Sequence, residues 1–366
     1  MSNLFTPLKL GHLVLNNRVI IAPMCQYSAE DGAATDWHTI HLGRLALSGA
    51  GMLILEATAV NPRGRISYGD LGLWDDRTEQ ALANSLFAVR KYSSMPIGIQ
   101  LAHAGRKAST QKPWEGGQVI ASDQTNGWLT IAPSASPYDS KDPIPEAATL
   151  EDINNIVNDF IEAAKRAERM NIDAIELHAA HGYLLHQFLS PIANQRDDQY
   201  GGSLENRMRL LIEIFDGVKA AVSEKITLGV RISATDWVEN GWDLDDSLIL
   251  AALLQAKGCQ FIHVSTAGLS PLQEIPVAPG FQVTFATAIK QVVDIPVIAV
   301  GLITDAQEAE SIIAYKQADA VALARAILYN PHWVWHAAAQ FGEQVIAPPQ
   351  YLRSPPYGVP SPIRSF

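Results

Sequence analysis

Two histidines and a tyrosine stand close together in the stretch His178-Ala179-Ala180-His181-Gly182-Tyr183. They follow the apolar run 173–177, which is typical of a buried strand. On a tight helical turn, side chains three positions apart share a face, so His178 and His181 can point at one spot. Two neutral imidazoles can donate hydrogen bonds to a carbonyl or nitro oxygen, and Tyr183 can then donate a proton. The stretch therefore predicts a catalytic site at a strand end.

Two other interpretations of the histidine pair compete with this one. The imidazoles could form half of a metal site, or they could be core histidines with capped ring nitrogens. A metal ion needs further ligands, and neither an HExxH motif nor a Cys-His cluster accompanies the pair. Core histidines rarely occur as a pair with a tyrosine beside a glycine at a strand end. The sequence therefore favours the catalytic interpretation, without a metal.

The composition narrows the classes of function. The 366 residues include 27 Lys and Arg against 38 Asp and Glu, a net charge of −11. This charge argues against nucleic acid or an anionic membrane as a partner, and we expect a small-molecule substrate. Neither a signal-peptide pattern nor an apolar run of membrane-spanning length is found, so we expect a cytoplasmic protein. Cys25 and Cys259 are too few for a disulfide framework or an iron–sulfur cluster.

The order of apolar runs predicts an α/β fold. Most strand-like runs are continuously apolar, as in parallel strands buried on both faces. Strands are expected at 19–24, 51–60, 97–103, 173–177, 227–233, 261–265, 296–301 and 320–324. Helices are expected between them, for example at 78–92, 150–169, 204–222, 247–257, 281–292 and 306–315. This is the pattern of one (β/α)8 TIM barrel; an open doubly wound sheet competes, but no GxGxxG follows the first strand.

Three segments depart from the strand–helix repeat. Residues 8–17 predict a hairpin that closes the bottom of the barrel. Residues 105–145 form an insertion after the third strand, in which the runs 119–121 and 129–131 predict a hairpin lid. Residues 343–366 form a proline-bearing tail, expected to be disordered or extended against a partner. The whole chain, 1–366, is expected to be a single barrel domain.

Polar side chains at the strand ends, where barrels carry their chemistry, indicate a flavin site. Arg231 lies inside an apolar strand, where a guanidinium needs an anionic ligand or a structural carboxylate. Gln100 offers a donor and an acceptor to an amide-bearing heterocycle. Gly301, Ala324 and Arg325 follow the last two strands, the usual phosphate site of a barrel. Together these features describe flavin mononucleotide (FMN), whose reduced form Arg231 would stabilise.

Four motifs closely resemble the Old Yellow Enzyme family. They are Ala22-Pro23-Met24-Cys25-Gln26-Tyr27, Gln100-Leu101-Ala102-His103-Ala104-Gly105-Arg106-Lys107, His178-Ala179-Ala180-His181-Gly182-Tyr183 and Gln195-Arg196-Asp197-Asp198-Gln199-Tyr200-Gly201-Gly202-Ser203. The similarity is greatest to the bacterial branch of xenobiotic reductases and NADPH dehydrogenases, and it extends from about residue 5 to about residue 353.

The resemblance implies an activity. The chain would be an FMN-dependent NAD(P)H oxidoreductase, an ene-reductase of activated C=C bonds in α,β-unsaturated carbonyl or nitro compounds. The mechanism would be ping-pong: NADPH, or NADH, delivers a hydride to the flavin and leaves before the alkene binds and receives it. The protein would be a homodimer or a homotetramer.

The resemblance also implies roles for individual residues. The flavin ring would be held by Ala22, Pro23, Met24, Cys25, Ala57, Gln100 and Arg231, and the phosphate by Gly301, Ala324 and Arg325. His178 and His181 would bind the substrate oxygen, and Tyr183 would protonate the α-carbon. Further substrate contacts would come from Cys25, from Tyr27 and from Arg353 of a neighbouring subunit. A small buried hydrophobe and a core tyrosine are the structural alternatives for Cys25 and Tyr27.

The chain departs from the family pattern at three places. Ala324 stands where a glycine often precedes the phosphate arginine, so this position has less backbone freedom. Leu302 stands where some xenobiotic reductases carry a tryptophan, so we expect a roomier pocket. Ser354-Pro355-Pro356 replaces the expected glycine and aromatic residue after Arg353.

Three other functions would share parts of this pattern. A dienoyl-thioester reductase is also a flavin barrel, but it needs an iron–sulfur cluster that two cysteines cannot supply. A barrel lyase or isomerase for phosphorylated sugars would share the phosphate site but needs a Schiff-base lysine at a strand end, and none is evident. A non-catalytic flavin-binding protein would not need the histidine pair or Tyr183.

Overall fold

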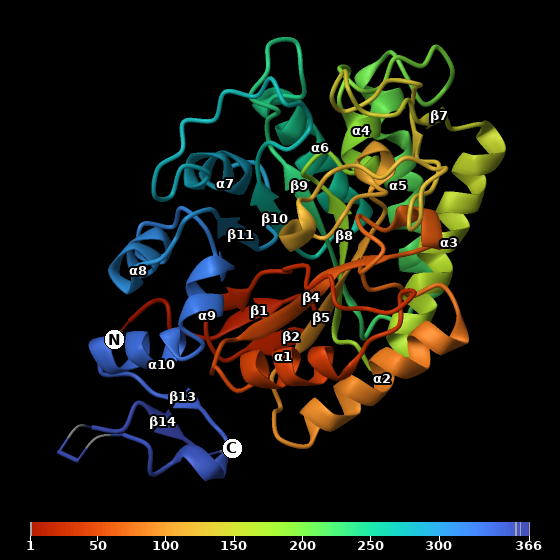
Figure 1. The fold of residues 1–366 in the computed structure, drawn as a ribbon. Helices are drawn as coiled ribbons and strands as arrows, with labels where there is room; N and C mark the ends of the chain where they lie inside the picture. Colours follow the sequence, from red (N-terminus) through yellow and green to blue (C-terminus); the bar gives the residue numbers. More distant parts are fainter. Residues whose placement is uncertain (1, 356, 359, 366) are drawn as a thin grey trace.

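Eight parallel strands form a closed barrel at the centre of the molecule (Figure 1). The structure is a computed structural model that describes residues 2–355, 357–358 and 360–365. Neighbouring strands follow the order β10-β11-β12-β3-β4-β5-β8-β9. In chain order they are β3 (Val19–Ile21), β4 (Met52–Ala59), β5 (Ile97–Ala102), β8 (Ala174–Ala179), β9 (Thr227–Ser233), β10 (Ile262–Ser265), β11 (Val297–Val300) and β12 (Ala320–Leu323). The predicted (β/α)8 barrel is confirmed.

The helices surround this barrel and alternate with its strands (Figure 1). The six predicted helices are all present, as α2 (Asp76–Arg90), α3 (Leu150–Arg169), α5 (Leu204–Ala221), α6 (Leu244–Lys257), α7 (Val283–Lys290) and α8 (Ala306–Ala314). Further helices are α1 (Asp36–Ala46), α4 (Leu184–Leu189), α9 (Arg325–Tyr329) and α10 (Trp333–Phe341). None of the described helices combines the length and the apolar character needed to cross a membrane.

Helix α3 shows how local sequence fixes these elements. Thr149 caps it, because its side chain accepts a hydrogen bond from the backbone N–H of Asp152 and the Asp152 carboxylate accepts one from the backbone N–H of Thr149. Ile153, Ile156 and Phe160 then recur at helical spacing and are buried against the barrel. Helix α3 begins and ends at the predicted residues.

A hairpin of β1 (Leu8–Leu10) and β2 (Leu13–Leu15) closes the bottom of the barrel. Its leucines pack among residues that line the barrel interior, such as Phe261 of the segment leading into β10. The Thr227 hydroxyl, at the start of β9, donates to the backbone oxygen of Leu10 (3.0 Å). The predicted hairpin cap is confirmed, and it leaves the opposite end of the barrel for the site.

The insertion between β5 and β8 does not form the predicted hairpin. Its strand β6 (Ile131–Ala132) pairs in parallel with β7 (Glu146–Ala147), whereas Val119 forms an isolated bridge with Thr110. Arg196 donates to the backbone oxygens of Pro133 and Ala148, at 2.9 and 2.5 Å. The prediction of a 119–131 hairpin is therefore wrong, because a distant arginine, not a local turn, holds β6 and β7 together.

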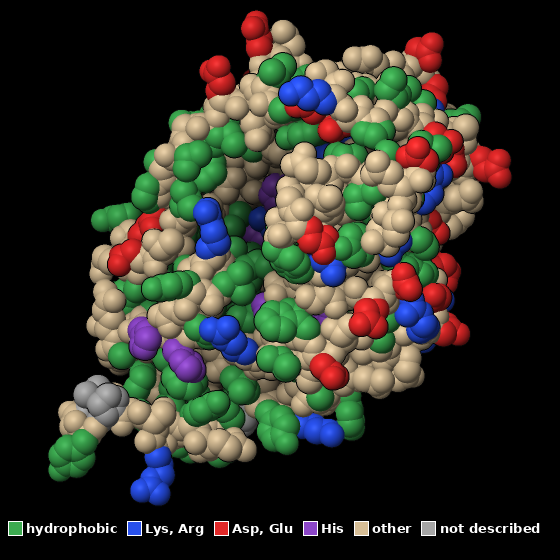
Figure 2. Space-filling view, viewed as in Figure 1, with side chains coloured by type: hydrophobic (Ala, Val, Ile, Leu, Met, Phe, Trp, Pro, Cys, Tyr) green, Lys and Arg blue, Asp and Glu red, His purple; other side chains and the backbone are tan. Residues whose placement is uncertain are grey.

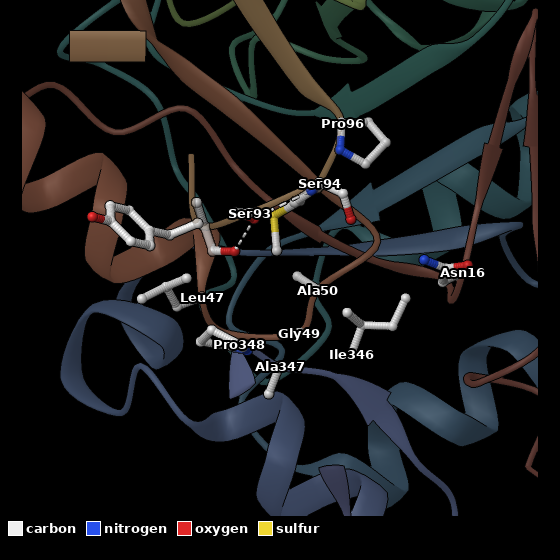
Figure 3. A pocket seen from close by; sticks show the side chains of 13 residues that line it. Asn16, Leu47, Gly49, Ala50, Ser93, Ser94, Pro96, Ile346, Ala347 and Pro348 are labelled. Atoms are coloured by element: carbon white, nitrogen blue, oxygen red, sulfur yellow. Dashed lines mark hydrogen bonds between the residues drawn. The ribbon is translucent and has the colours of Figure 1, made fainter. Parts of the chain in front are cut away.

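The C-terminal tail packs on its own chain. Its strands β13 (Val345–Ile346) and β14 (Ile363–Arg364) pair with each other, and Val345 and Ile363 belong to the main hydrophobic core. Ile346, Ala347 and Pro348 face the loops around Gly49 and Ser93 across a small cavity (Figure 3). The expected disorder, or extension against a partner, is not what the described part of the tail shows. Residues 356, 359 and 366 of the tail lie outside the described residues.

Candidate active site

The two histidine rings face each other at the carboxyl end of β8. His178 Nε2 and His181 Nδ1 lie 3.3 Å apart, and the ring planes are perpendicular. The ring of Tyr183 stands edge-on to His178, with centroids 5.0 Å apart. The backbone N–H of Ala180 donates to His178 Nδ1 (3.2 Å), which places the proton of a neutral His178 on Nε2. The structure therefore brings two imidazoles and a phenol to one point.

Burial keeps these three side chains uncharged at neutral pH. Desolvation, reinforced by the positive charge of Arg231, holds the pKa of both His178 and His181 well below the usual value. Desolvation also raises the pKa of the Tyr183 phenol well above its usual value, with Cys25 adding to the effect. The two histidines are therefore hydrogen-bonding groups without charge, and Tyr183 retains its proton.

A strained turn carries His181 away from β8. His181 has φ +58° and Gly182 has φ +74°. The left-handed conformation costs a residue other than glycine roughly 1–2 kcal/mol. A side chain on Gly182 would clash with the backbone oxygen of Gly268, so this position requires glycine. This left-handed turn points the His181 ring back towards His178. The two rings therefore meet without the regular helical turn that the spacing suggested.

Ser265, at the end of β10, fixes the outer edge of the His181 ring. Its hydroxyl lies 2.8 Å from His181 Nε2 and 3.3 Å from the side-chain oxygen of Gln282. That oxygen also accepts a hydrogen bond from Thr266 (2.7 Å), while the Gln282 amide donates to the backbone oxygen of Val300 (2.8 Å). Ser265 and Gln282 therefore connect the histidine pair to the strand ends on the other side of the barrel.

A buried polar cluster lines the barrel interior beside the histidines. The Glu176 carboxylate accepts a hydrogen bond from the Gln100 amide (2.6 Å) and lies 2.8 Å from His263 Nδ1. Burial raises the pKa of Glu176, but His263, Arg231 and Gln100 together outweigh it and hold that pKa below its usual value. Glu176 of β8 is therefore a buried carboxylate with partners on the adjacent strand β5 and on β10, the second strand on its other side.

Arg231 in β9 stands next to His178 in β8 and His263 in β10 in the strand register. It is only 7% exposed. Its Nε is buried and has no hydrogen-bond partner among the described residues. Burial lowers the pKa of Arg231, and the negative charge of Glu176 opposes that effect. Among the described residues, Glu176 forms its ion pair with His263 and not with Arg231. A buried guanidinium left in this state calls for an anionic or acceptor-rich ligand.

Cys25 follows β3, and its thiol lies near the backbone of Ala57 in β4. Desolvation raises the pKa of this thiol well above its usual value, and the carboxyls of Asp70 and Glu56 add to the effect. Glu56 lies at an irregularity of β4 and accepts a hydrogen bond from the backbone N–H of Gln26 (2.8 Å). The thiol of Cys25 is therefore protonated at neutral pH.

The segment before Cys25 lies on the barrel rim. The backbone N–H of Ala22 donates to the oxygen of Leu323 (2.9 Å), which joins it to the end of β12. Pro23 is half-buried, and Met24 packs against the hydrophobic core. The predicted flavin-ring residues of β3, β4, β5 and β9 thus all lie at the carboxyl ends or in the interior of these strands.

Tyr27 sits beneath the insertion. It has φ +51°, and its ring meets Trp114 edge-on, with centroids 6.0 Å apart. Burial, with Cys25 adding, raises the pKa of the Tyr27 phenol, so the hydroxyl keeps its proton. The insertion therefore covers part of the rim near Cys25, although it lacks the predicted hairpin.

A cavity of about 390 Å³ opens beside the ends of β11 and β12. It is lined by Gly301, Ala324 and Arg325, together with Leu302 and Gln282. Gly301 has φ +126°, and a side chain there would clash with the Gln282 amide. Figure 2 shows a hollow in one face of the molecule, with histidine and basic side chains visible within it. The three residues predicted to bind phosphate thus line one cavity.

Residues 3–344 match the model of the NADH:flavin oxidoreductase / NADH oxidase family. The chain belongs to this family. The predicted membership of the Old Yellow Enzyme family is thereby confirmed, and the chain is a flavin oxidoreductase. The chain is 44% identical over 356 residues to the NADPH dehydrogenase of Listeria innocua, covering 97% of this chain and 99% of the relative. It is 41% identical over 361 residues to an NADH:flavin oxidoreductase of Gibberella zeae, covering 94% and 87%.

Solved structures of two reductases share the fold. Morphinone reductase in complex with tetrahydroNAD superposes with a TM-score of 0.76 at 29% identity, covering 94% of this chain and 92% of that one. A 2-naphthoyl-CoA reductase complex gives a TM-score of 0.81 at 25% identity, covering 90% of this chain. The chain spans only 51% of that reductase, so the similarity covers about half of the larger enzyme.

Within the flavin oxidoreductase fold, Lys107 is a site residue to which sequence reasoning gave no role. Its Nζ donates to the backbone oxygens of His181 and Gly268, both at 2.8 Å, and lies 5.3 Å from the centroid of Tyr183. Burial, with Arg106 adding, lowers the pKa of Lys107 to about 8. A Schiff-base lysine needs a free amine, whereas this amine is held by two carbonyl groups, which argues against the lyase alternative.

Glu176, Ser265 and Gln282 are further site residues that sequence reasoning missed. A signal existed for Glu176, which is a charged residue inside an apolar strand, as Arg231 is. Ser265 and Gln282 carry no such signal, because their roles depend on a contact between distant segments.

Arg353 is exposed in the tail, so this chain does not place it among its own site residues. The described residues contain no group of three or more His, Cys, Asp or Glu that could hold a metal ion.

Proposed function

We propose that this flavin oxidoreductase is an FMN-dependent, NADPH-preferring ene-reductase of the bacterial xenobiotic reductase branch. Its substrates are alkenes activated by a carbonyl or nitro group. The observation that carries the proposal is the meeting of His178 Nε2 and His181 Nδ1 at 3.3 Å beside a protonated Tyr183. Two uncharged donors aimed at one point fit an oxygen that gains negative charge during the reaction.

The residues of the barrel interior fit FMN. The buried guanidinium of Arg231, with its unpaired Nε, would face the part of the ring that becomes negative on reduction. Gln100 has one amide hydrogen on Glu176 and keeps its oxygen for the ring edge. Ala22, Pro23, Met24, Cys25 and Ala57 would pack along the ring, while Gly301, Ala324 and Arg325 would hold the phosphate in the cavity beside β11 and β12.

When bound, FMN would supply hydride transfer in two separate steps, from the nicotinamide and then to the alkene. The protein would orient and polarise the alkene. His178 donates from Nε2, because Ala180 occupies its Nδ1. The Ser265 hydroxyl has one proton and lies 3.3 Å from Gln282 Oε1 but only 2.8 Å from His181 Nε2. We propose that it donates across the shorter contact when substrate binds, which leaves the His181 proton on Nδ1, facing the same point. The two donors then withdraw charge from the double bond through its oxygen.

Tyr183 would deliver the proton that completes the reduction. Its raised pKa keeps the phenol protonated, and its ring packs against His178, within reach of the carbon next to the bound carbonyl. Cys25 and Tyr27, both protonated, would contact the substrate from the opposite rim without adding negative charge. Burial of the whole group excludes water from the carbon that receives the proton.

The comparisons support a nicotinamide as the hydride donor. Relatives that match nearly the full chain carry the name NADPH dehydrogenase, and morphinone reductase binds tetrahydroNAD. NADPH is proposed over NADH because the relatives named NADPH dehydrogenase are 44% identical to this chain, whereas morphinone reductase is 29% identical. We also propose a cytoplasmic homodimer or homotetramer, in which Arg353, exposed on the tail, would reach a neighbouring site. Light scattering of the purified protein would give the number of subunits.

Product analysis tests the proposed reaction. The purified protein with NADPH and 2-cyclohexenone is expected to give cyclohexanone, because the donors activate the C=C bond through the carbonyl. Gas chromatography separates this product from 2-cyclohexenol. Formation of the allylic alcohol, or consumption of NADPH without any change in the enone, would contradict the proposal.

A further inference from the structure

Side chains form hydrogen bonds with the backbone N–H and the backbone oxygen of both His181 and Gly182, the two left-handed residues of the turn. The N–H of His181 donates to Ser233 (2.9 Å), and the N–H of Gly182 donates to His186 Nδ1 (2.9 Å). Lys107 donates to the oxygen of His181 (2.8 Å), and Gln187 donates to the oxygen of Gly182 (2.7 Å). A left-handed pair of residues thus keeps its conformation through four separate side chains.

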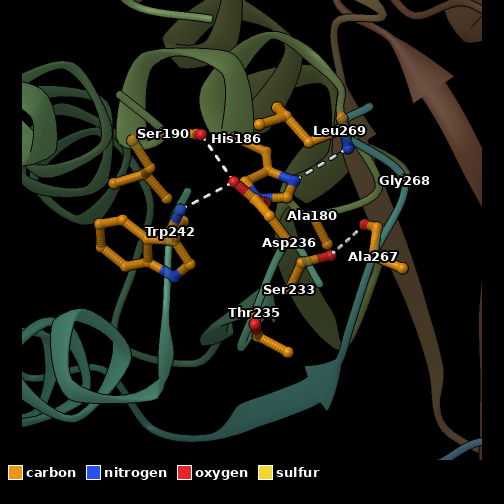
Figure 4. Close-up of polar contacts among 12 residues, drawn as sticks. Ala180, His186, Ser190, Ser233, Thr235, Asp236, Trp242, Ala267, Gly268 and Leu269 are labelled. Atoms are coloured by element: carbon orange, nitrogen blue, oxygen red, sulfur yellow. Dashed lines mark hydrogen bonds and ion pairs between the residues drawn. The ribbon is translucent and has the colours of Figure 1, made fainter. Parts of the chain in front are cut away.

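One of these four contacts continues into a buried acid–base pair (Figure 4). His186 Nε2 lies 2.8 Å from Asp236 Oδ1, and both side chains are 0% exposed. The second carboxylate oxygen of Asp236 accepts hydrogen bonds from the Ser190 hydroxyl (2.6 Å) and the backbone N–H of Trp242 (2.8 Å). Asp236 follows β9 and His186 lies in α4, so the pair joins two elements behind the histidine pair.

The contacts of His186 fix which of its nitrogens carries the proton. Because the N–H of Gly182 donates to Nδ1, that nitrogen presents a lone pair, and the proton of the neutral ring lies on Nε2. The proton on Nε2 then lies beside the Asp236 carboxylate, 2.8 Å away, without the alignment of a regular hydrogen bond. Each group in the chain Gly182–His186–Asp236 therefore has one compatible donor or acceptor role, as when a carboxylate holds one histidine tautomer.

We propose that His186 and Asp236 are positioning residues for the oxygen-binding histidine pair. They would hold the peptide between His181 and Gly182 so that His181 Nδ1 meets His178 Nε2. This inference rests on the proposed function, because it assigns the pair a task in binding the substrate oxygen. Neither residue touches the substrate; both act through the backbone of Gly182.

The cost of burying this pair supports the proposal. A well-packed apolar pair would fill the space behind the turn at least as favourably, because burying a charge costs free energy that its partners only partly return. An apolar pair could not accept the N–H of Gly182, which would then be buried without a partner. The polar chain also ends at the peptide between two site residues, His181 and Tyr183, and not at a distant core position.

Nitrogen-15 NMR of the native, flavin-loaded enzyme with labelled histidine tests the tautomer without any substitution. The His186 resonance is assigned by its loss in a His186→Asn variant or, if that variant is not stable, by the coupling of its Nδ1 to Gly182 N–H. The expected result is a pyridine-type Nδ1 and a protonated Nε2. A protonated Nδ1 would overturn the proposal, because the ring could not then accept the N–H of Gly182.

Asp236→Asn tests the positioning role directly. The amide of the new side chain donates to His186 Nε2, which drives the proton to Nδ1 and breaks the bond to Gly182. Binding of 4-hydroxybenzaldehyde, a phenol whose oxygen would accept from both histidines under the proposed function, should weaken. Reoxidation of the reduced flavin by 2-cyclohexenone should slow, because a displacement of about 1 Å costs on the order of 10²-fold in rate. Flavin affinity should be unchanged, because the hydrogen bonds of the Asp236 side chain go to Ser190 and Trp242, neither of which is proposed to hold the flavin.

His186→Asn and Ser190→Ala complete the experiment. The carboxamide oxygen of His186→Asn lies near the position of Nδ1 and can accept the N–H of Gly182, so this variant should recover most of the ligand affinity. Ser190→Ala removes a bond to Asp236 on the side away from the turn, so it should lower the unfolding temperature without changing affinity. If Asp236→Asn lowers stability as Ser190→Ala does but keeps ligand affinity and reoxidation rate, the pair is only structural and the proposal is wrong.

The two proposals fail in different ways. If the wild-type enzyme binds flavin and is reduced by NADPH but neither the enone nor the phenol binds, the proposed function fails. If the wild-type enzyme turns over the enone and Asp236→Asn does so equally well per bound flavin, only the positioning role of His186 and Asp236 fails.

Discussion

His178 Nε2 and His181 Nδ1 point at each other across 3.3 Å, with their ring planes perpendicular. If both nitrogens carry protons, only an acceptor placed between and in front of them can satisfy both. Burial and Arg231 keep both rings neutral, so they act as donors of hydrogen bonds and do not form an ion pair with the ligand. This relationship supports the proposal that a carbonyl or nitro oxygen binds at the site.

His178→Ala and His181→Ala are each expected to slow reoxidation of the reduced flavin by 2-cyclohexenone. Loss of one donor to a developing oxyanion typically costs about 10²–10³ in rate. Stopped-flow absorbance of the flavin measures this step alone. His12→Ala, at an exposed histidine on the bottom hairpin loop, is the matched control and should behave as wild type. Equal rates in all three variants would mean that the histidine pair does not bind the substrate oxygen.

Tyr183→Phe is expected to slow the same half-reaction by about 10²–10⁴, the usual contribution of a general acid. The pKa of Tyr183 is raised well above its usual value by burial, so the wild-type rate should not fall through loss of this proton between pH 7 and about 10. A wild-type rate that falls with a midpoint near neutral pH would contradict the assignment.

Arg231→Met should weaken flavin retention and lower the reduction potential of any flavin that stays bound. The guanidinium is buried beside the predicted ring site, and its removal takes away the charge that stabilises the reduced, negative ring. Equilibrium reduction against a reference dye measures the potential. Arg209→Met, at a surface arginine of α5, serves as the control. An unchanged potential in Arg231→Met would show that Arg231 lies away from the ring.

Asp70→Asn should change how stability depends on pH. Burial, with Glu56 adding, raises the pKa of Asp70 to about 7, whereas an unfolded aspartate titrates near about 3.9. A raised pKa means that the stabilising, protonated form is lost as pH rises from about 4 to about 7, at a cost of at most about 4 kcal/mol. Urea unfolding at pH 5 and pH 8 should show a smaller loss of stability in Asp70→Asn than in wild type. Equal losses would contradict the raised pKa.

Sequence reasoning predicted the barrel well because its signals are local. Continuous apolar runs mark strands that are buried on both faces, and all eight residues of β4 are indeed buried. Helix α3 carries its own cap at Thr149 and its own apolar face, so both of its ends could be predicted. Strand ends then bring the predicted flavin and substrate residues, apart from Arg353 in the tail, to one end of the barrel without further information.

The parts of the fold and the site that could not be predicted depend on contacts between distant segments. The predicted lid hairpin is wrong because Arg196, some sixty residues away, holds β6 and β7 instead. The left-handed turn at His181 could not be predicted either, since its stability comes from Lys107, Ser233 and the pair His186–Asp236. Spacing alone suggested a helical turn that would bring the histidines together; the structure achieves the same juxtaposition through strain held by buried side chains.

An anaerobic absorption titration of the purified protein tests the central claim most directly. NADPH is added first and 2-cyclohexenone second, while the flavin spectrum is recorded. We expect bleaching by NADPH and recovery of the yellow colour by the enone, in amounts equal to the bound flavin. Bleaching without recovery would keep the cofactor but contradict the role of His178, His181 and Tyr183. A protein that shows no flavin spectrum even after FMN is supplied would contradict the account at its centre.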